Sequence, residues 1–510
     1  MDGLKFSPVQ FTLAAGLAFL VYKVVTRKTT TLPGPPGLPI IGNLLDLNVE
    51  YLYTKCHEWG QQYGDVFRLN ALGETMVIVN SAEAANEFFD KRGTKYSGRP
   101  YMPMITELMG WEWSFTFMPY GQRWKEMRGL FHRNYHAGMP EHRMPAVEEA
   151  QKLVVSLHKN PEKYSDHMKC YTAGLIIKRT YGYNVDSMED SLLRLVDDTN
   201  KTTSIAVTPG KFWVNLFPSM KYIPEWMIPG GGFKKQAREW KQLTDAMVDV
   251  PFQMVKGKLA NGSAEMSFVS SCLETDTSSS HWNLTDKLIK ETAAVAYAAG
   301  ADTTFSVLRT FTLYMALNPD IQQRIQAEID AACHDKIPTF RDRPQLPLME
   351  ATLVETMRLV PPLPLAVPHS LDEDDVYKGM FIPKGSLVLP NLWAILRDEK
   401  QYPNPSQFNP DRYASKPGLM DKTVGAIFGY GRRSCAGKGL ALDTAWVAMV
   451  TMVSLFDIVK PKDQEINIKV MPGAASHMAP FPCTFSPRAK ALGTLEELAQ
   501  DVAAKRAARA

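Results

Sequence analysis

One loop, residues 428–437 with the sequence Phe-Gly-Tyr-Gly-Arg-Arg-Ser-Cys-Ala-Gly, constrains this chain more than any other feature. Its glycines permit turns and close approaches that a Cβ atom would block, so the loop can wrap a flat group and turn main-chain amides towards a sulfur. A thiolate held in this way is suited to bind haem iron, to which it donates electron density. The loop therefore predicts that Cys435 is the axial ligand of a haem. The alternative is a glycine-rich turn around a buried structural cysteine.

Five positions of the loop match the pattern Phe-x-x-Gly-x-Arg-x-Cys-x-Gly, and through them the chain resembles the cytochrome P450 family. Within the microsomal class it looks like fungal secondary-metabolism monooxygenases of the O-methylsterigmatocystin oxidoreductase type. The resemblance implies a mainly α fold with small β-sheets and a bound haem b. The matching positions are Phe428, Gly431, Arg433, Cys435 and Gly437.

Length and composition set broad limits on the fold and the partners. The chain has 510 residues, of which 45% are hydrophobic, so it can bury a large core. Length alone suggests about three domains, but the family motifs run from about Pro33 to Arg488 and imply one haem domain, residues 46–510. The net charge is only +3 and the charges are interspersed, which indicates no nucleic-acid partner. Six cysteines without paired spacing fit a reducing compartment.

The first residues predict a membrane anchor. Residues 6–25 are mostly apolar and long enough to span a bilayer, and Lys23, Arg27 and Lys28 close the run. By the positive-inside rule the remainder then lies in the cytosol. We expect a single-pass anchor over residues 1–28 in the endoplasmic reticulum membrane, followed by a stiff Pro-rich linker over 29–45. A cleaved signal peptide or an interfacial helix is the alternative, because polar residues interrupt the run.

A long apolar helix is predicted from Thr285 to about Leu317. Gly300 in its middle costs about 1 kcal/mol against alanine, so it calls for a packing or functional reason, and space for dioxygen is one. Asp302 and Thr303 match the family's acid–alcohol pair, and the resemblance implies that they hold waters and pass protons to the oxygen. The alternative is a threonine bonded to its own helix beside a solvated aspartate.

Four further residues are expected at the haem carboxylates. Trp124 and Arg128 are four residues apart and share one helix face, which resembles the Trp-x-x-x-Arg pair with which the family meets a propionate. A guanidinium binds a carboxylate with two parallel hydrogen bonds, and an indole N–H adds a donor. Arg433 joins them from the cysteine loop. His369 stands where many members carry arginine, so its contribution depends on its protonation.

Several segments are expected to shape the scaffold and the pocket. Glu355, Arg358 and Arg412 resemble the family's structural ion network behind the cysteine loop. Hairpins are predicted at Val66–Val79 and at Val376–Val388, which Lys378-Gly379 and Lys384-Gly385 would turn. Four stretches are candidates for contact with substrate or for a lid or membrane-dipping access loop: residues 101–118, 209–232, 365–367 and 473–478.

Together these features predict a membrane-anchored haem-thiolate monooxygenase. The resemblance implies electrons from NADPH through a separate NADPH-cytochrome P450 reductase, with cytochrome b5 as an optional partner, since the chain has no dinucleotide fingerprint. The substrate is expected to be a small lipophilic molecule, a terpenoid or aromatic secondary metabolite, with a xenobiotic as an alternative. Two other classes stay open: a haem-thiolate isomerase, dehydratase or peroxygenase, and a non-enzymatic haem-based sensor or lipophile carrier.

Overall fold

The computed structural model describes residues 31–47, 49–136, 140–208, 210–228, 232–275, 284–334, 336–471, 473 and 475–508. Helices dominate this part of the chain, as expected for a mainly α fold with small sheets. The predicted anchor at residues 6–25 lies outside the described residues. The α-helices are α2 (Leu52–Tyr63), α3 (Ala82–Ala85), α4 (Gln122–Tyr135), α5 (Pro140–Lys159), α6 (Tyr164–Tyr181), α7 (Ser191–Val207), α8 (Gly232–Ala260), α9 (Phe268–Glu274), α10 (Asp286–Leu317), α11 (Pro319–Cys333), α12 (Pro347–Leu359), α13 (Leu392–Ile395), α14 (Leu419–Ile427), α15 (Lys438–Leu455) and α16 (Leu492–Ala507).

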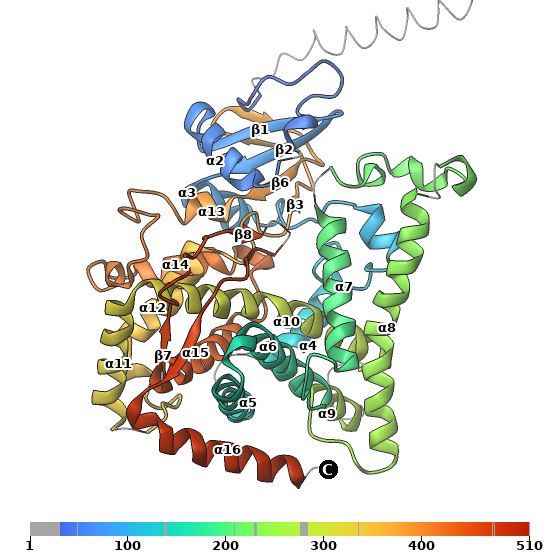
Figure 1. Ribbon diagram of the computed structural model, residues 1–510. Helices are drawn as coiled ribbons and strands as arrows, with labels where there is room; N and C mark the ends of the chain where they lie inside the picture. The colour runs from blue at the N-terminus through green and yellow to red at the C-terminus, as the bar shows by residue number, and fades with distance from the viewer. Residues whose placement is uncertain are drawn as a thin grey trace, which may run out of the picture.

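The strands form four small sheets. The largest has the order β1-β2-β6-β3 and lies at one end of the molecule beside α2 (Figure 1). Within it β2 pairs with β6 in parallel although some 300 residues of chain separate them in sequence. The strands are β1 (Val66–Ala71), β2 (Glu74–Val79), β3 (His369–Ser370), β4 (Asp375–Tyr377), β5 (Met380–Ile382), β6 (Leu387–Pro390), β7 (Phe456–Val459), β8 (Val470–Met471), β9 (His477–Met478) and β10 (Thr484–Pro487).

The first predicted hairpin is confirmed and the second is confirmed in part. β1 and β2 pair antiparallel around Leu72 and Gly73, whose φ angles of 53° and 91° suit a tight hairpin turn. β4 and β5 pair in the same way around Lys378-Gly379. The strand after Lys384-Gly385, however, does not return to β5: β6 joins the large sheet between β2 and β3. Its apolar residues are buried there, which favours the larger sheet over a local hairpin.

Helix α10 runs through the middle of the helical part, with α6 and α4 packed across it and α7 and α8 along one side (Figure 1). It begins after Thr285, whose side chain accepts the Leu288 N–H, and ends at Leu317, as predicted. Most of its residues are buried, because α10 contributes to two clusters of buried hydrophobic residues. Any group held beside α10 therefore lies deep in the protein.

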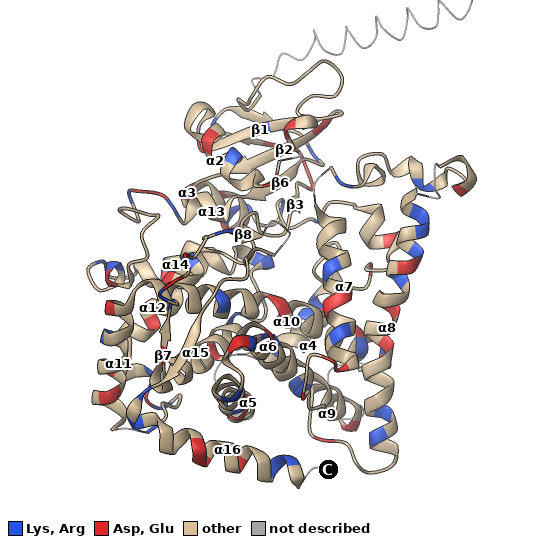
Figure 2. Cartoon of the chain, viewed as in Figure 1, with Lys and Arg blue, Asp and Glu red and all other residues tan. Residues whose placement is uncertain are grey.

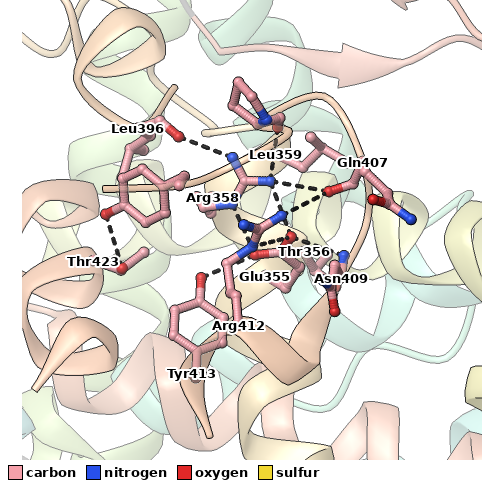
Figure 3. A network of polar contacts seen from close by, with 12 residues as sticks. Glu355, Thr356, Arg358, Leu359, Leu396, Gln407, Asn409, Arg412, Tyr413 and Thr423 are labelled. Atoms are coloured by element: carbon pink, nitrogen blue, oxygen red, sulfur yellow. Dashed lines mark hydrogen bonds and ion pairs between the residues drawn. The ribbon is translucent and has the colours of Figure 1, made fainter. Parts of the chain in front are cut away.

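A buried ion network joins α12 to the segment that precedes the cysteine loop (Figure 3). Glu355, fully buried, accepts hydrogen bonds from Arg358 Nε at 2.8 Å and from Arg412 Nε at 3.0 Å. The Asn409 N–H and the Tyr413 hydroxyl fill its remaining acceptor positions. Arg358 also donates to the Leu396 and Pro405 carbonyls. The predicted network is confirmed: the one carboxylate contacts both guanidinium groups, and main-chain carbonyls accept their other hydrogen bonds, which is what burial requires.

Charges of both signs are interspersed over the surface helices, as the sequence predicted (Figure 2). Within the described residues one helix, α15, is long and apolar enough to cross a membrane by composition alone. Some 72% of that stretch is buried inside the protein. It is therefore the apolar core helix that follows the cysteine loop.

Candidate active site

A cavity of about 300 Å³ lies between the large sheet, helix α10 and the cysteine loop. Its walls are mainly apolar, and among the described residues no aspartate or glutamate lines it. Its lining residues include Phe89, Arg99, Phe115, Thr116, Trp124, Arg128, Arg179, Ala299, Gly300, Thr303, Thr304, Ala366, Val367, His369, Phe428, Arg433 and Cys435. This is the space in which the sequence places a haem and its substrate.

The cysteine loop has a tightly constrained main chain. Gly431 has φ +58°, and a Cβ atom there would stand 1.9 Å from the Phe89 carbonyl oxygen, so only glycine fits. Gly429, with φ +81°, makes the preceding turn. The Cys435 N–H donates to the Phe428 carbonyl at 2.7 Å, which closes the loop. The loop thereby holds the cysteine in one orientation.

Cys435 faces the cavity. Its side chain is exposed to this space although protein encloses the site. Burial raises the pKa of the thiol, while the Gly437 N–H, which donates to the sulfur, and the charges of Arg128 and Lys438 act in the opposite direction. Of the six cysteines, all of which are described, Cys435 alone lines the cavity.

Four arginines line the cavity, Arg179 among them, and the other three, Arg99, Arg128 and Arg433, form no ion pair with a described residue. Arg99 donates to the Thr116, Val367 and Pro368 carbonyls, and Arg433 donates to the Ser97, Phe115 and Met118 carbonyls. Arg128 Nη2 donates to the Ser434 carbonyl at 2.6 Å, beside the cysteine. Burial and the neighbouring charge of Arg433 hold the pKa of Arg99 well below its ordinary value. Burial and the charge of Arg128 lower the pKa of Arg433 to about 10.

Trp124 and His369 line the cavity with these arginines. The Trp124 ring lies 5.3 Å from the Arg128 guanidinium carbon and 4.8 Å from that of Arg433, so it stabilises both cations through its π face. Its indole N–H donates to the Phe115 carbonyl rather than into the cavity. His369 Nδ1 lies 2.7 Å from the Tyr96 carbonyl, and burial together with the charges of Arg99 and Arg433 holds its pKa well below 6.5.

These residues fit a haem. Concentrated buried positive charge is costly unless an anion accompanies it, and no carboxylate of the described residues supplies one at the cavity. The two propionates of a haem would supply carboxylates for these arginines to bind, and Cys435 faces the same cavity from the loop. The apolar lining suits the porphyrin plane.

Helix α10 brings only one of its two predicted catalytic residues to the cavity. Thr303 lines it, and its hydroxyl donates to the Ala299 carbonyl at 3.1 Å. Asp302 does not line the cavity; its Oδ2 atom lies 3.0 Å from His477 Nε2. A Cβ atom at Gly300 would stand 2.9 Å from the Ile176 side chain of α6, so close helix packing accounts for this glycine.

The four stretches expected at the pocket differ in their positions. Of residues 101–118, Phe115 and Thr116 line the cavity, while the other apolar residues mostly pack into the core. Ala366 and Val367 line it, whereas Leu365 packs against another cluster. No described residue of 209–232 or 473–478 lines the cavity. In the former stretch the large exposed side chains are those of Trp213, Tyr222, Trp226 and Met227.

Arg99 and His477 are functional candidates that the sequence did not reveal. Arg99 sits in an Arg-Pro dipeptide with no motif around it, and only the fold brings it to Arg433. His477 lies in a stretch predicted to touch substrate, but its contact is with Asp302. Neither residue has a local sequence signal, because each acts on a partner that is distant in the chain.

Comparison with known proteins agrees with this site. The family model for cytochrome P450 matches residues 32–484. A cytochrome P450 monooxygenase of Armillaria gallica is 46% identical over 92% of this chain and 94% of its own length. Tryptamine 4-monooxygenase of Psilocybe cyanescens is 37% identical, covering 93% and 96%, and a cytochrome P450 monooxygenase of Coprinopsis cinerea is 36% identical, covering 97% and 96%. A haem with a cysteine thiolate as its axial ligand is the cofactor of this family. The chain therefore belongs to the cytochrome P450 family and is a haem-containing monooxygenase.

Proposed function

We propose that Cys435 is the thiolate ligand of the haem and that this protein inserts one oxygen atom into a small, neutral, lipophilic substrate. The observation that carries the proposal is that Cys435 alone among the six cysteines lines the cavity, in a loop whose glycine geometry no other residue type satisfies. When bound, the haem supplies the iron at which dioxygen is activated, one oxygen atom going to the substrate and the other to water.

The chain's own residues hold the cofactor in this proposal. Arg99, Arg128 and Arg433 bind the propionates, since all three line the cavity and none forms an ion pair with a described residue. Trp124 supports two of them through its ring. His369 would contribute after taking up a proton, because Nδ1 is occupied by the Tyr96 carbonyl and Nε2 of the neutral ring has no proton to donate. Phe428 lines the same cavity as Cys435.

In this proposal Asp302 and Thr303 deliver protons to the cavity. The Thr303 hydroxyl reaches the cavity, where it can hold a water while it donates to the Ala299 carbonyl. Asp302 is the adjacent carboxylate and can exchange protons with water, because its side chain is 28% exposed. This pair favours a monooxygenase over an isomerase or peroxygenase, which would need no proton relay.

The cavity favours a neutral substrate. Its walls are apolar, and no carboxylate of the described residues faces it, so a bound ammonium would lose water without gaining a partner. One relative is named a tryptamine 4-monooxygenase, and an aromatic substrate fits these walls as well as a terpenoid does. We infer that an aromatic or terpenoid secondary metabolite without a free amine is the substrate class.

Electrons would come from NADPH through a separate reductase at an endoplasmic reticulum membrane. The chain has no dinucleotide-binding motif of its own. The segment from Trp213 to Met227 exposes the side chains of Trp213, Tyr222, Trp226 and Met227, and the basic residues Lys234 and Lys235 follow it in the sequence. This composition suits an interface with lipid. Residues 6–25 would anchor the chain in the same membrane.

The direct test is co-expression with a cytochrome P450 reductase and mass-spectrometric screening of neutral aromatic and terpenoid compounds, each beside an analogue that carries an amine. The expected result is NADPH-dependent product heavier by one oxygen atom, labelled when heavy-isotope oxygen gas is supplied, from neutral compounds in preference to amines. Product from the amines alone would refute the substrate class. Turnover without NADPH or dioxygen would favour the isomerase class.

A further inference from the structure

The carboxylate of Asp302 is held by a residue from a distant part of the chain. His477 Nε2 lies 3.0 Å from Asp302 Oδ2, and the two residues are 175 positions apart. His477 belongs to the short strand β9, which packs against α10. Both side chains are mostly buried, with exposed fractions of 21% and 28%. A hydrogen bond between two partly buried groups fixes the orientation of both.

The contact lies on a different face of α10 from the cavity. Asp302, Phe305 and Ser306 are spaced by three and four residues and so share one side of the helix. The His477 ring packs 5.8 Å from the Phe305 ring, and the Ser306 hydroxyl donates to the Ser476 carbonyl. Ser476 and His477 therefore contact α10 at three residues, Asp302, Phe305 and Ser306.

The direction of the hydrogen bond follows from the chemistry of the two groups. An ionised carboxylate only accepts, so His477 Nε2 must carry the proton. His477 Nδ1 is buried and has no hydrogen-bond partner among the described residues. Among the described residues the imidazole therefore has one polar contact, which is with Asp302. The other carboxylate oxygen, Oδ1, has no protein partner in the described part of the chain and stays available to water.

We propose that His477 is a positioning residue for Asp302: it holds Oδ2 so that Oδ1 is the oxygen that exchanges protons with the waters leading to Thr303. The inference rests on the proposed role of Asp302 in proton delivery. His477 itself does not line the cavity. Its loss would leave the carboxylate present but free to rotate, so protons would arrive more slowly and reduced oxygen would leave as peroxide instead of water.

The experiment is a double-mutant cycle between Asp302 and His477. His477→Phe keeps the ring and its packing on Phe305 but removes the donor, whereas His477→Gln keeps an N–H close to the position of Nε2. Ser306→Ala removes the neighbouring contact with the loop and leaves the Asp302–His477 pair intact, so it is the matched control. Each change is made in the wild-type and Asp302→Asn backgrounds.

Two measurements need no knowledge of the substrate. The first is the ratio of peroxide formed to NADPH consumed, with purified reductase. The second is the infrared stretching frequency of carbon monoxide bound to the reduced protein, which responds to the orientation of nearby polar groups. Product formation by the wild-type protein tests the proposed function and enters neither measurement, so the two can fail separately.

In the wild-type background, His477→Phe should slow proton delivery about tenfold, less than the roughly hundredfold effect that loss of an acid–base group itself produces, and should therefore raise the ratio of peroxide formed to NADPH consumed. It should also shift the carbon monoxide frequency in the same direction as Asp302→Asn. His477→Gln and Ser306→Ala should match wild type. In the Asp302→Asn background, His477→Phe should change neither the peroxide ratio nor the carbon monoxide frequency any further. An unchanged ratio in His477→Phe, an equal rise in Ser306→Ala, or a rise that persists without the Asp302 carboxylate would each overturn the proposal.

Discussion

Arg99 and Arg433 both line the cavity, where the charge of Arg433 disfavours that of Arg99, and both donate to main-chain carbonyls instead of to a carboxylate. They come from positions 334 residues apart, and only the fold brings them together. Burial of two like charges is unfavourable in the protein alone. A haem with two propionates turns this pair into a binding site, which is why we regard the arginines as belonging to the cofactor.

Replacing Arg99 should weaken haem binding more than it weakens the fold. Hydrogen bonds to charged groups contribute roughly 1.5–3 kcal/mol, so Arg99→Gln should speed haem loss on the order of 10- to 100-fold. The measurement is transfer of haem to an excess of a haem-free acceptor protein. Arg238→Gln, which alters an exposed ion pair on α8, is the control and should leave the rate unchanged. Equal rates for the two variants would contradict the assignment of Arg99.

His369 should make the haem-free protein sensitive to acid. Burial and two neighbouring arginines hold its pKa well below the ordinary value of 6.5 in the folded chain. The unfolded chain then binds more protons than the folded one as the pH falls through about 6.5, so stability falls with it, by up to about 1.4 kcal/mol per pH unit.

Urea unfolding between about pH 5 and pH 8 measures this effect. His369→Gln should remove this part of the acid dependence from the haem-free protein. Haem should also reduce it in the wild type, because a propionate beside the ring favours the imidazolium. An acid dependence that is identical in the variant would show that other groups cause it.

Glu355 should be the most sensitive position of the structural network. Glu355→Gln leaves two buried guanidinium groups, those of Arg358 and Arg412, without their counter-ion, and breaking a buried pair costs about 3–5 kcal/mol. The free energy of unfolding from denaturant titration measures the loss. The exposed pair between Arg324 and Asp411 offers the contrast, because Arg324→Gln should cost less than about 1 kcal/mol. Similar losses in the two variants would mean that burial does not decide the energetics here.

Thr303 should determine what share of the electrons from NADPH yields oxygenated product and what share yields peroxide. Thr303→Ala removes the hydroxyl that faces the cavity, so a larger share of the NADPH consumed should appear as peroxide and less as oxygenated product. Thr303→Ser keeps a hydroxyl and should stay close to wild type. Peroxide and NADPH are measured together with purified reductase. Unchanged coupling in the alanine variant would remove Thr303 from the proton path.

The sequence predicted the parts of this site that are encoded locally. The cysteine loop, the long helix from Thr285 and the hairpin around Gly73 depend on turn residues, caps and spacings within a few positions, and the structure has all three. The network of Glu355 was also foreseen, because the family motif supplies both arginines.

Contacts between distant segments had no such signal. The parallel pairing of β2 with β6, the meeting of Arg99 with Arg433 and the hydrogen bond from His477 to Asp302 each join residues far apart in the chain. Composition and the family resemblance make the aromatic stretch at 101–118 a candidate for the pocket, with ordinary core as the alternative. Most of its apolar residues fill the core instead, because the same side chains suit either environment.

The absorption spectrum of the reduced, carbon monoxide-bound protein tests the central claim most directly. Thiolate ligation gives the long-wavelength Soret band for which the family is named, so wild type and Cys170→Ser, which alters a cysteine outside the cavity, should both show it. Cys435→Ser should lose it while the protein stays folded. A Cys435→Ser protein that retained the band, or a folded and haem-loaded wild type that lacked it, would contradict the assignment of Cys435 as the ligand.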